Sequence, residues 1–181
     1  MPGSKYTVRV SKDYLVFCSG HFITYAGDKC ERIHGHNYRV AVEVEDILDE
    51  NHYVFDFIAL KDLTRAVTDE IDHRMLLATR NKQITLNDDG ANWLVRYEDR
   101  RWSFPKEECA LLPIANTTAE LLADYIGDQL RSAIASKRIN LPRVMRIVVE
   151  ESFGQSATSE WINPEWRALT PDSRFDQGQG Q

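Results

Sequence analysis

Residues 30–36 read CERIHGH and continue into NYRVAVEVE at residues 37–45, and this stretch decides the fold of the chain. Residues 37–45 alternate between apolar and polar side chains, which predicts a β-strand buried on one face. Because side chains i and i+2 of a strand project to the same side, we expect His34 and His36 on the apolar face. The residues that share this face are Tyr38, Val40, Val42 and Val44.

Two imidazoles on an inner face must be hydrogen-bonded or must bind a metal, because burying unpaired polar groups is costly. Gly35 between them allows another backbone to approach closely. His21 shares the parity of the apolar residues in FCSGHFI, so it can face inward from a neighbouring strand. Three histidines with an open fourth position are typical of catalytic zinc, whereas Cys30 as a fourth ligand would make a closed structural site. Both alternatives stay open.

Further polar positions admit a structural and a functional interpretation. Glu151 ends an apolar stripe of the strand predicted at 144–151, so its carboxylate needs N–H donors from an arginine or from a ligand. Asp72 and His73 are either a cap at a helix end or a pair that moves protons. The run TTAE at 117–120 fits a helix capping box, which alone can explain its hydroxyl and carboxylate groups.

The remaining pattern predicts a single α+β domain over residues 1–181 with an antiparallel sheet and two amphipathic helices. The segment 81–112 is expected to be a hairpin insertion built from short strands, and the tail after about residue 171 is expected to be disordered. The other expected elements are strand material at 5–22 with a turn at 12–13, helices at 56–72 and 118–137, and strands at 144–152 and 157–162.

The composition excludes some classes of partner. A formal net charge of −6 argues against a general binder of nucleic acid or anionic membranes. No apolar leader and no run of membrane-spanning length is visible. Cys18, Cys30 and Cys109 form no even disulfide framework, so we expect a reducing, cytoplasmic setting.

Six motifs, in their order, resemble the 6-pyruvoyl-tetrahydropterin synthase family, which includes the bacterial 6-carboxy-tetrahydropterin synthases of the queuosine pathway. The resemblance covers roughly residues 6–80 and 113–161. No single motif decides it, but the ordered set is specific. The motifs are FCSGH, CERIHGH, VFDFIALK, DHRML, NTTAELLADYI and IVVEES.

The resemblance implies a tunnelling fold (T-fold), in which a four-stranded antiparallel sheet carries two helices on one side. It implies trimers that close into a barrel and often pair as homohexamers, with active sites between subunits. The implied substrate is 7,8-dihydroneopterin triphosphate, and the implied product is 6-carboxy-tetrahydropterin or, next, the 6-pyruvoyl-tetrahydropterin of tetrahydrobiopterin synthesis. The implied roles are Zn²⁺ binding by His21, His34 and His36, a base at Cys30, a proton relay at Asp72 and His73, and pterin binding by Glu151, Thr118 and Glu120.

Glu31 raises an alternative within the same family. The combination C-E-x-x-HGH resembles members proposed to act also in folate synthesis, where the side chain is cleaved to leave 6-hydroxymethyl-dihydropterin. Glu31 is then a second acid or base, and otherwise it is a solvated loop residue. A non-catalytic pterin-binding or structural-zinc protein, with Cys30 as a ligand, is the alternative from another class.

Overall fold

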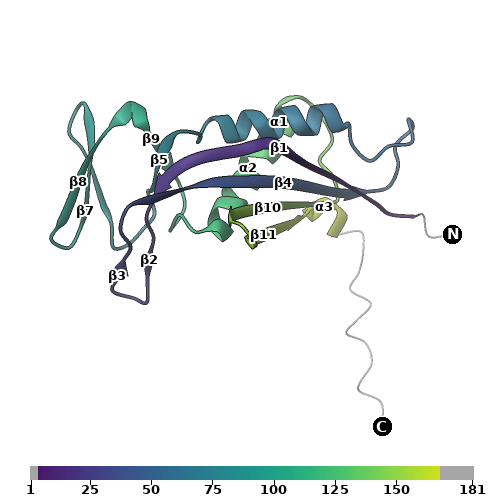
Figure 1. Cartoon of the computed structure of the whole chain (residues 1–181). Coiled ribbons are helices and arrows are strands. Elements are labelled where there is room, and N and C mark those ends of the chain that lie inside the picture. The colour runs from purple at the N-terminus through teal and green to yellow at the C-terminus, as the bar shows by residue number, and fades with distance from the viewer. Residues whose placement is uncertain (1–3, 168–181) are drawn as a thin grey trace, which may run out of the picture.

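A computed structural model describes residues 4–167 of the chain, and its centre is a six-stranded sheet (Figure 1). Its strands are, in spatial order, β11 (Gln155–Ile162), β10 (Val144–Ser152), β4 (His34–Asp46), β1 (Tyr6–His21), β5 (Arg74–Ala78) and β9 (Cys109–Leu112). The first four are antiparallel neighbours, which confirms the predicted sheet. The short strands β5 and β9 extend it by parallel pairing, which was not predicted, because short apolar runs lack the alternation of a half-buried strand.

Two helices cover one face of this sheet. Helix α1 (Phe57–Asp69) begins at the predicted N-cap Asp56, whose Oδ1 accepts from the backbone N–H of Ile58 at 2.7 Å. Helix α2 (Ala119–Ser136) begins at the N-cap Thr118. Both helices bury their apolar stripes in the same core as the inner faces of β1, β4 and β10. A short third helix, α3, spans Pro164–Arg167.

The capping box at 117–120 is not formed as predicted. The cap is Thr118, whose Oγ1 accepts from the N–H of Leu121, and Thr117 lies one residue before this cap. Thr117 instead donates its hydroxyl to the carbonyl of Phe22 at 3.0 Å and is buried. The structural interpretation therefore does not account for Glu120, which stands one position too early for the reciprocal bond of a capping box.

Strand β1 is continuous, and the turn predicted at residues 12–13 is absent. The register with β4 shifts between Ser11, which faces Ala41, and Val16, which faces Arg39. Such a bulge absorbs extra residues without reversing the chain. It also changes which side chains point inward, from Val10 before the bulge to Leu15 and every second residue up to His21 after it.

The segment between β5 and β9 builds a second, three-stranded sheet, which we call the added sheet. Its antiparallel strands are β6 (Thr85–Asp88), β7 (Asn92–Tyr97) and β8 (Arg100–Pro105), followed by a 3-10 turn at Lys106–Glu108. It lies at the end of the main sheet beside a small hairpin of β2 (Thr24–Tyr25) and β3 (Lys29–Cys30) (Figure 1). A second core joins these parts through the buried side chains of Phe22, Leu77 and Val95.

The tail predicted after about residue 171 lies outside the described residues. Within residues 4–167, no helix has both the length and the apolar character that crossing a bilayer requires.

Candidate functional site

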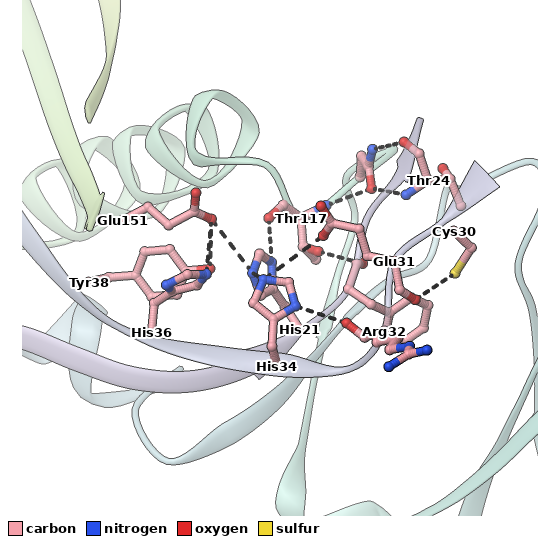
Figure 2. Close-up of polar contacts among 12 residues, drawn as sticks. His21, Thr24, Cys30, Glu31, Arg32, His34, His36, Tyr38, Thr117 and Glu151 are labelled. Atoms are coloured by element: carbon pink, nitrogen blue, oxygen red, sulfur yellow. Dashed lines mark hydrogen bonds and ion pairs between the residues drawn. The ribbon is translucent and has the colours of Figure 1, made fainter. Parts of the chain in front are cut away.

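Three histidines meet where β1 ends and β4 begins (Figure 2). His21 on β1 is the register partner of His34 on β4, and His36 follows two residues later on the same strand. One ring nitrogen of each histidine lies within 4.8 Å of the other two. His21 is buried, as its parity in the sequence predicted. The cluster therefore draws one ligand from β1 and two from β4.

The hydrogen bonds of two of these rings fix their tautomers. His21 Nδ1 lies 3.0 Å from the carbonyl oxygen of Thr117, and His34 Nδ1 lies 2.9 Å from that of Arg32. A carbonyl only accepts, so Nδ1 carries the hydrogen in each neutral ring and Nε2 keeps a lone pair. Two lone pairs therefore face one another across the 3.2 Å between these Nε2 atoms.

The protonation of the cluster favours a metal ligand set over a hydrogen-bonded one. Burial, together with the neighbouring imidazoles, lowers the pKa of His21 to about 4 against the raising effect of its bond to Thr117. His36 Nε2 is buried and has no hydrogen-bond partner among the described residues. The lone pair on Nε2 of the neutral His21 ring and the unpartnered Nε2 atom of His36 beside it fit the preference of zinc for imidazole nitrogen.

Gly35 allows the two strands to come close at this point. A Cβ atom at Gly35 would lie 3.0 Å from the carbonyl oxygen of Ser19 on β1, closer than side-chain atoms normally come. The sequence-based expectation of a close backbone approach is confirmed. The glycine therefore helps to bring His21 and His34 into register.

Glu151, at the end of β10, turns its carboxylate toward the cluster. Its Oε1 atom lies 3.6 Å from His21 Nε2 and 3.7 Å from His36 Nε2. Tyr38 donates its hydroxyl to the same oxygen at 3.4 Å. Burial, and to a smaller extent the Glu151 carboxylate, raises the pKa of Tyr38, so the phenol stays protonated. No arginine forms a salt bridge with Glu151 in the described part of the chain. The structural alternative of an arginine partner is thus absent there.

A cavity of about 340 Å³ opens beside the histidines. It brings together Glu31, Glu151 and Glu120, the last from the first turn of α2. None of the residues that line it is a lysine or an arginine. A carboxylate-lined cavity suits a ligand that presents several N–H groups. The lining residues are His21, Ile23, Glu31, His34, Thr118, Ala119, Glu120, Glu151, Gln155, Ser156 and Ala157.

Glu31, and not Cys30, faces this cavity (Figure 2). Glu31 Oε2 lies 3.9 Å from His34 Nε2. The Cys30 thiol instead packs against the second core and donates to the carbonyl of Glu31 at 3.5 Å. Burial raises the pKa of Cys30 more than the nearby Arg100 lowers it. Within one chain, the thiol is therefore both turned away from the histidines and held in its protonated form.

Asp72 and His73 form a pair outside the cavity. Asp72 Oδ2 lies 2.8 Å from His73 Nδ1, and Asp72 Oδ1 accepts from the backbone N–H of Cys18 at 2.7 Å. Although burial opposes it, these bonds lower the pKa of Asp72. The His73 side chain is 80% exposed, and neither residue lines the cavity. Within a single chain, the Asp72–His73 pair therefore does not share the cavity with the three histidines.

Sequence reasoning missed the residues that orient the site through backbone atoms. Thr117 positions His21 through its carbonyl oxygen, which no side-chain pattern reveals. Arg100, far away in the sequence, binds the carbonyls of Cys30 and Glu31. Tyr38 was predicted only as a core residue, although it bonds to Glu151. The available signal was a tyrosine on the apolar face of one predicted strand and an inward carboxylate at the end of another.

Comparisons with known proteins give one family for the matched part of the chain. The profile of the family described as 6-pyruvoyl tetrahydropterin synthase matches residues 9–160. Two archaeal relatives carry provisional names as 6-carboxy-5,6,7,8-tetrahydropterin synthases. That of Methanocaldococcus jannaschii is 29% identical over 144 residues, which are 79% of this chain and 88% of the relative. That of Pyrococcus horikoshii is 31% identical over 150 residues, which are 82% of this chain and 88% of the relative.

A solved structure confirms the expected T-fold. The crystal structure of 6-pyruvoyl tetrahydropterin synthase from Plasmodium vivax matches with a TM-score of 0.81 and 29% identity, and the match covers 88% of this chain and 99% of that one. Two further structures of the P. vivax protein carry alanine or cysteine in place of a glutamate described as a catalytic residue.

Proposed function

The chain belongs to the 6-pyruvoyl tetrahydropterin synthase family, and on this premise we propose that it is a zinc-dependent lyase acting on 7,8-dihydroneopterin triphosphate. The observation that carries the proposal is the arrangement of His21, His34 and His36, whose ring nitrogens converge while Nε2 of His36 has no hydrogen-bond partner among the described residues. A closed structural site would need a fourth ligand at the cluster, and the thiol of Cys30 packs elsewhere. The geometry therefore favours a site that leaves room for substrate.

Zinc held by these three rings would act as a Lewis acid on the hydroxyl groups of the substrate side chain. The protein groups around it then bind the pterin and move protons. Glu151 and Glu120 line the cavity and can accept hydrogen bonds from the amino and ring N–H groups of a pterin, and Thr118 lies beside Glu120. The absence of cations among the lining residues supports placing the pterin in the cavity and the triphosphate outside it.

We propose that the active enzyme is a homo-oligomer, a trimer or hexamer. The resemblance assigns a proton relay to Asp72 and His73, yet neither residue lines the cavity beside the histidines of its own chain. Within residues 4–167, strand β11 of the main sheet also has a neighbouring strand on only one side. Pairing of sheet edges between subunits would supply that neighbour and bring the relay pair of one subunit toward the cavity of another.

Three products are in competition, and the position of Glu31 bears on the choice among them. The names of the archaeal relatives favour 6-carboxy-tetrahydropterin. The position of the Glu31 carboxylate, 3.9 Å from a proposed zinc ligand, favours side-chain cleavage to 6-hydroxymethyl-dihydropterin. A glutamate is described as a catalytic residue in the P. vivax protein, which supports a catalytic role for a glutamate in this chain as well. We propose that Glu31 is the base for cleavage and that any tetrahydropterin product depends on Cys30.

A product assay with matched variants tests the proposal. Purified zinc-loaded protein is incubated with 7,8-dihydroneopterin triphosphate, and products are identified by chromatography and mass spectrometry. We expect Glu31→Ala to abolish the hydroxymethyl product and Cys30→Ala to leave it, whereas Glu50→Ala, in an exposed loop, should change nothing. If the zinc-loaded oligomer consumes no substrate, the enzymatic proposal is wrong. If Glu31→Ala keeps the hydroxymethyl product, the role of Glu31 is wrong.

The product also identifies the pathway that the chain serves. The three cysteines are all free, which is compatible with the proposed cytoplasmic setting. A carboxy product would connect the chain to queuosine synthesis, a pyruvoyl product to tetrahydrobiopterin synthesis, and a hydroxymethyl product to folate synthesis.

A further inference from the structure

The added sheet binds the backbone of the segment that carries Cys30 and Glu31. Arg100 on β8 donates from Nη2 to the carbonyl of Cys30 at 2.8 Å and from Nη1 to the carbonyl of Glu31 at 3.2 Å. Tyr97 on β7 donates its hydroxyl to the carbonyl of Asp28 at 2.5 Å. Gln83 donates its side-chain amide to the carbonyl of Gly27. Four carbonyl groups within five residues are thus held by side chains from outside the segment.

This external support matters because the segment has little structure of its own. The hairpin strands β2 and β3 have two residues each. Beyond the hairpin, the N–H of Glu31 donates to the carbonyl of Ile23 at 2.9 Å. A two-stranded hairpin of this length is only marginally stable alone. The added sheet therefore decides how the peptide between Cys30 and Glu31 is oriented.

Arg100 is itself fixed in place by aromatic rings. Its guanidinium lies over Tyr97, 5.0 Å from the ring centre, and near Trp102 at 5.7 Å. Trp102 stacks on Phe22 at 5.1 Å with an angle of 28° between the rings, and Phe22 follows His21 in the chain. A planar guanidinium held in this way can serve two carbonyls at once, whereas a lysine ammonium cannot copy the fork.

The consequence falls on two adjacent side chains. Neighbouring side chains of an extended segment point to opposite sides, so only one of Cys30 and Glu31 can face the cavity. With both carbonyls bound by Arg100, the carboxylate of Glu31 lines the cavity and the thiol of Cys30 packs against the second core. Rotation of the segment about its own axis would exchange the two environments, and the two hydrogen bonds to Arg100 oppose that rotation.

We propose that Arg100 is a positioning residue: by clamping the Cys30–Glu31 backbone it presents Glu31 to the substrate and keeps Cys30 away, and so it selects the product. The added sheet is then a specificity element of this chain. The inference rests on the function proposed above, because a choice between products presupposes that both residues can act on the same substrate.

The test compares Arg100→Met and Arg100→Lys with the control Arg101→Met in the full-length, zinc-loaded protein. Arg101 is the next residue on β8, and it is exposed. We expect Arg100→Met to lower kcat for the hydroxymethyl product about tenfold or more, with KM changed little and bound zinc retained, because misplacement of an acid or base costs rate more than binding. The share of tetrahydropterin product should rise. Arg100→Lys should restore only part of kcat, and Arg101→Met should behave as the wild type.

A second measurement keeps the inference testable without turnover. Hydrogen–deuterium exchange of the backbone amides in residues 24–33 should speed up in Arg100→Met and stay unchanged in Arg101→Met, while the helices keep their protection. Unchanged kcat, product ratio and amide exchange in Arg100→Met would overturn the clamp. An inactive wild type would reject the proposed enzyme, and the exchange comparison would still decide whether Arg100 holds the segment.

Discussion

The Nε2 atoms of His21 and His34 lie 3.2 Å apart, although each ring donates its Nδ1 hydrogen to a backbone carbonyl. Neither Nε2 atom then has a hydrogen to give to the other. Burial lowers the pKa of His21 to about 4, so protonation of His21 does not relieve the contact near neutral pH. The pair is therefore arranged for a cation that accepts both lone pairs.

The amount of bound zinc should depend on the histidines of the cluster and not on a histidine elsewhere in the chain. We expect His34→Ala and His36→Ala to weaken zinc binding by more than about 100-fold. Mutation of a residue that is only hydrogen-bonded to a zinc ligand already lowers metal affinity by up to about 100-fold, and loss of the ligand itself should cost more. His52→Ala, in an exposed loop, is the control. Elemental analysis and competition with a chelator measure the effect. Loss of zinc from Cys30→Ala would instead indicate a sulfur ligand and a closed structural site.

Strand parity was a sound guide wherever one face of a strand is buried without interruption. It placed His36 beside the buried Tyr38 and turned Glu151 inward at the end of β10, whereas His34, at the first residue of β4, is exposed. The start of helix α1 at Asp56 was predicted from the residue type, because an N-cap side chain bonds to backbone N–H groups only two or three residues away. Local patterns were sufficient for these elements since the physical cause lies within a few residues of each position.

Features that depend on distant contacts were not predictable in this way. The bulge that follows Ser11 was interpreted as a turn, since a break in alternation does not tell whether the chain reverses. The sides taken by Cys30 and Glu31 depend on Arg100, about seventy residues away. The parallel strand β9 pairs only after the added sheet returns the chain to β5. In each case the deciding interaction is tertiary.

Gly35→Ala should disturb the site through the backbone. A Cβ atom there would lie 3.0 Å from the carbonyl oxygen of Ser19, and a paired backbone cannot yield easily. We expect a loss of about 1–3 kcal/mol in the free energy of unfolding, together with weaker zinc binding. Gly20→Ala is the matched control, because its Cβ would meet the flexible end of Met75 at 3.2 Å. Equal losses in both variants in chemical denaturation would contradict this account.

Asp72→Asn should weaken the connection between β1 and the turn before β5. The carboxylate accepts from the N–H of Cys18 and from His73, and a hydrogen bond to a charged group contributes about 2 kcal/mol. These bonds lower the pKa of Asp72 below its ordinary 3.8. The stabilisation is therefore present above pH 3.8 and is lost as the pH falls through the lowered pKa.

Urea unfolding of wild type and Asp72→Asn at a series of pH values measures this difference. The gap in unfolding free energy should be constant near neutral pH and should shrink below about pH 4, because the protonated wild-type side chain then resembles the amide. Asp69→Asn, at the exposed end of α1, is the control and should show no comparable loss. A gap that persists unchanged into acid would mean that the carboxylate charge is not its source.

The Cys30 thiol should titrate above its ordinary range. Burial raises the pKa of Cys30 from 9.0, Arg100 opposes this in part, and Glu31 adds to it, so little thiolate exists at neutral pH. In zinc-free Cys18→Ser/Cys109→Ser protein, iodoacetamide should react slowly at pH 8, and the rate should still rise above pH 9. Glu31→Gln should move the curve to lower pH, because it removes a nearby negative charge. A rate that reaches its plateau below pH 8 would instead describe an activated thiol, and Cys30 would then be the stronger candidate for the base.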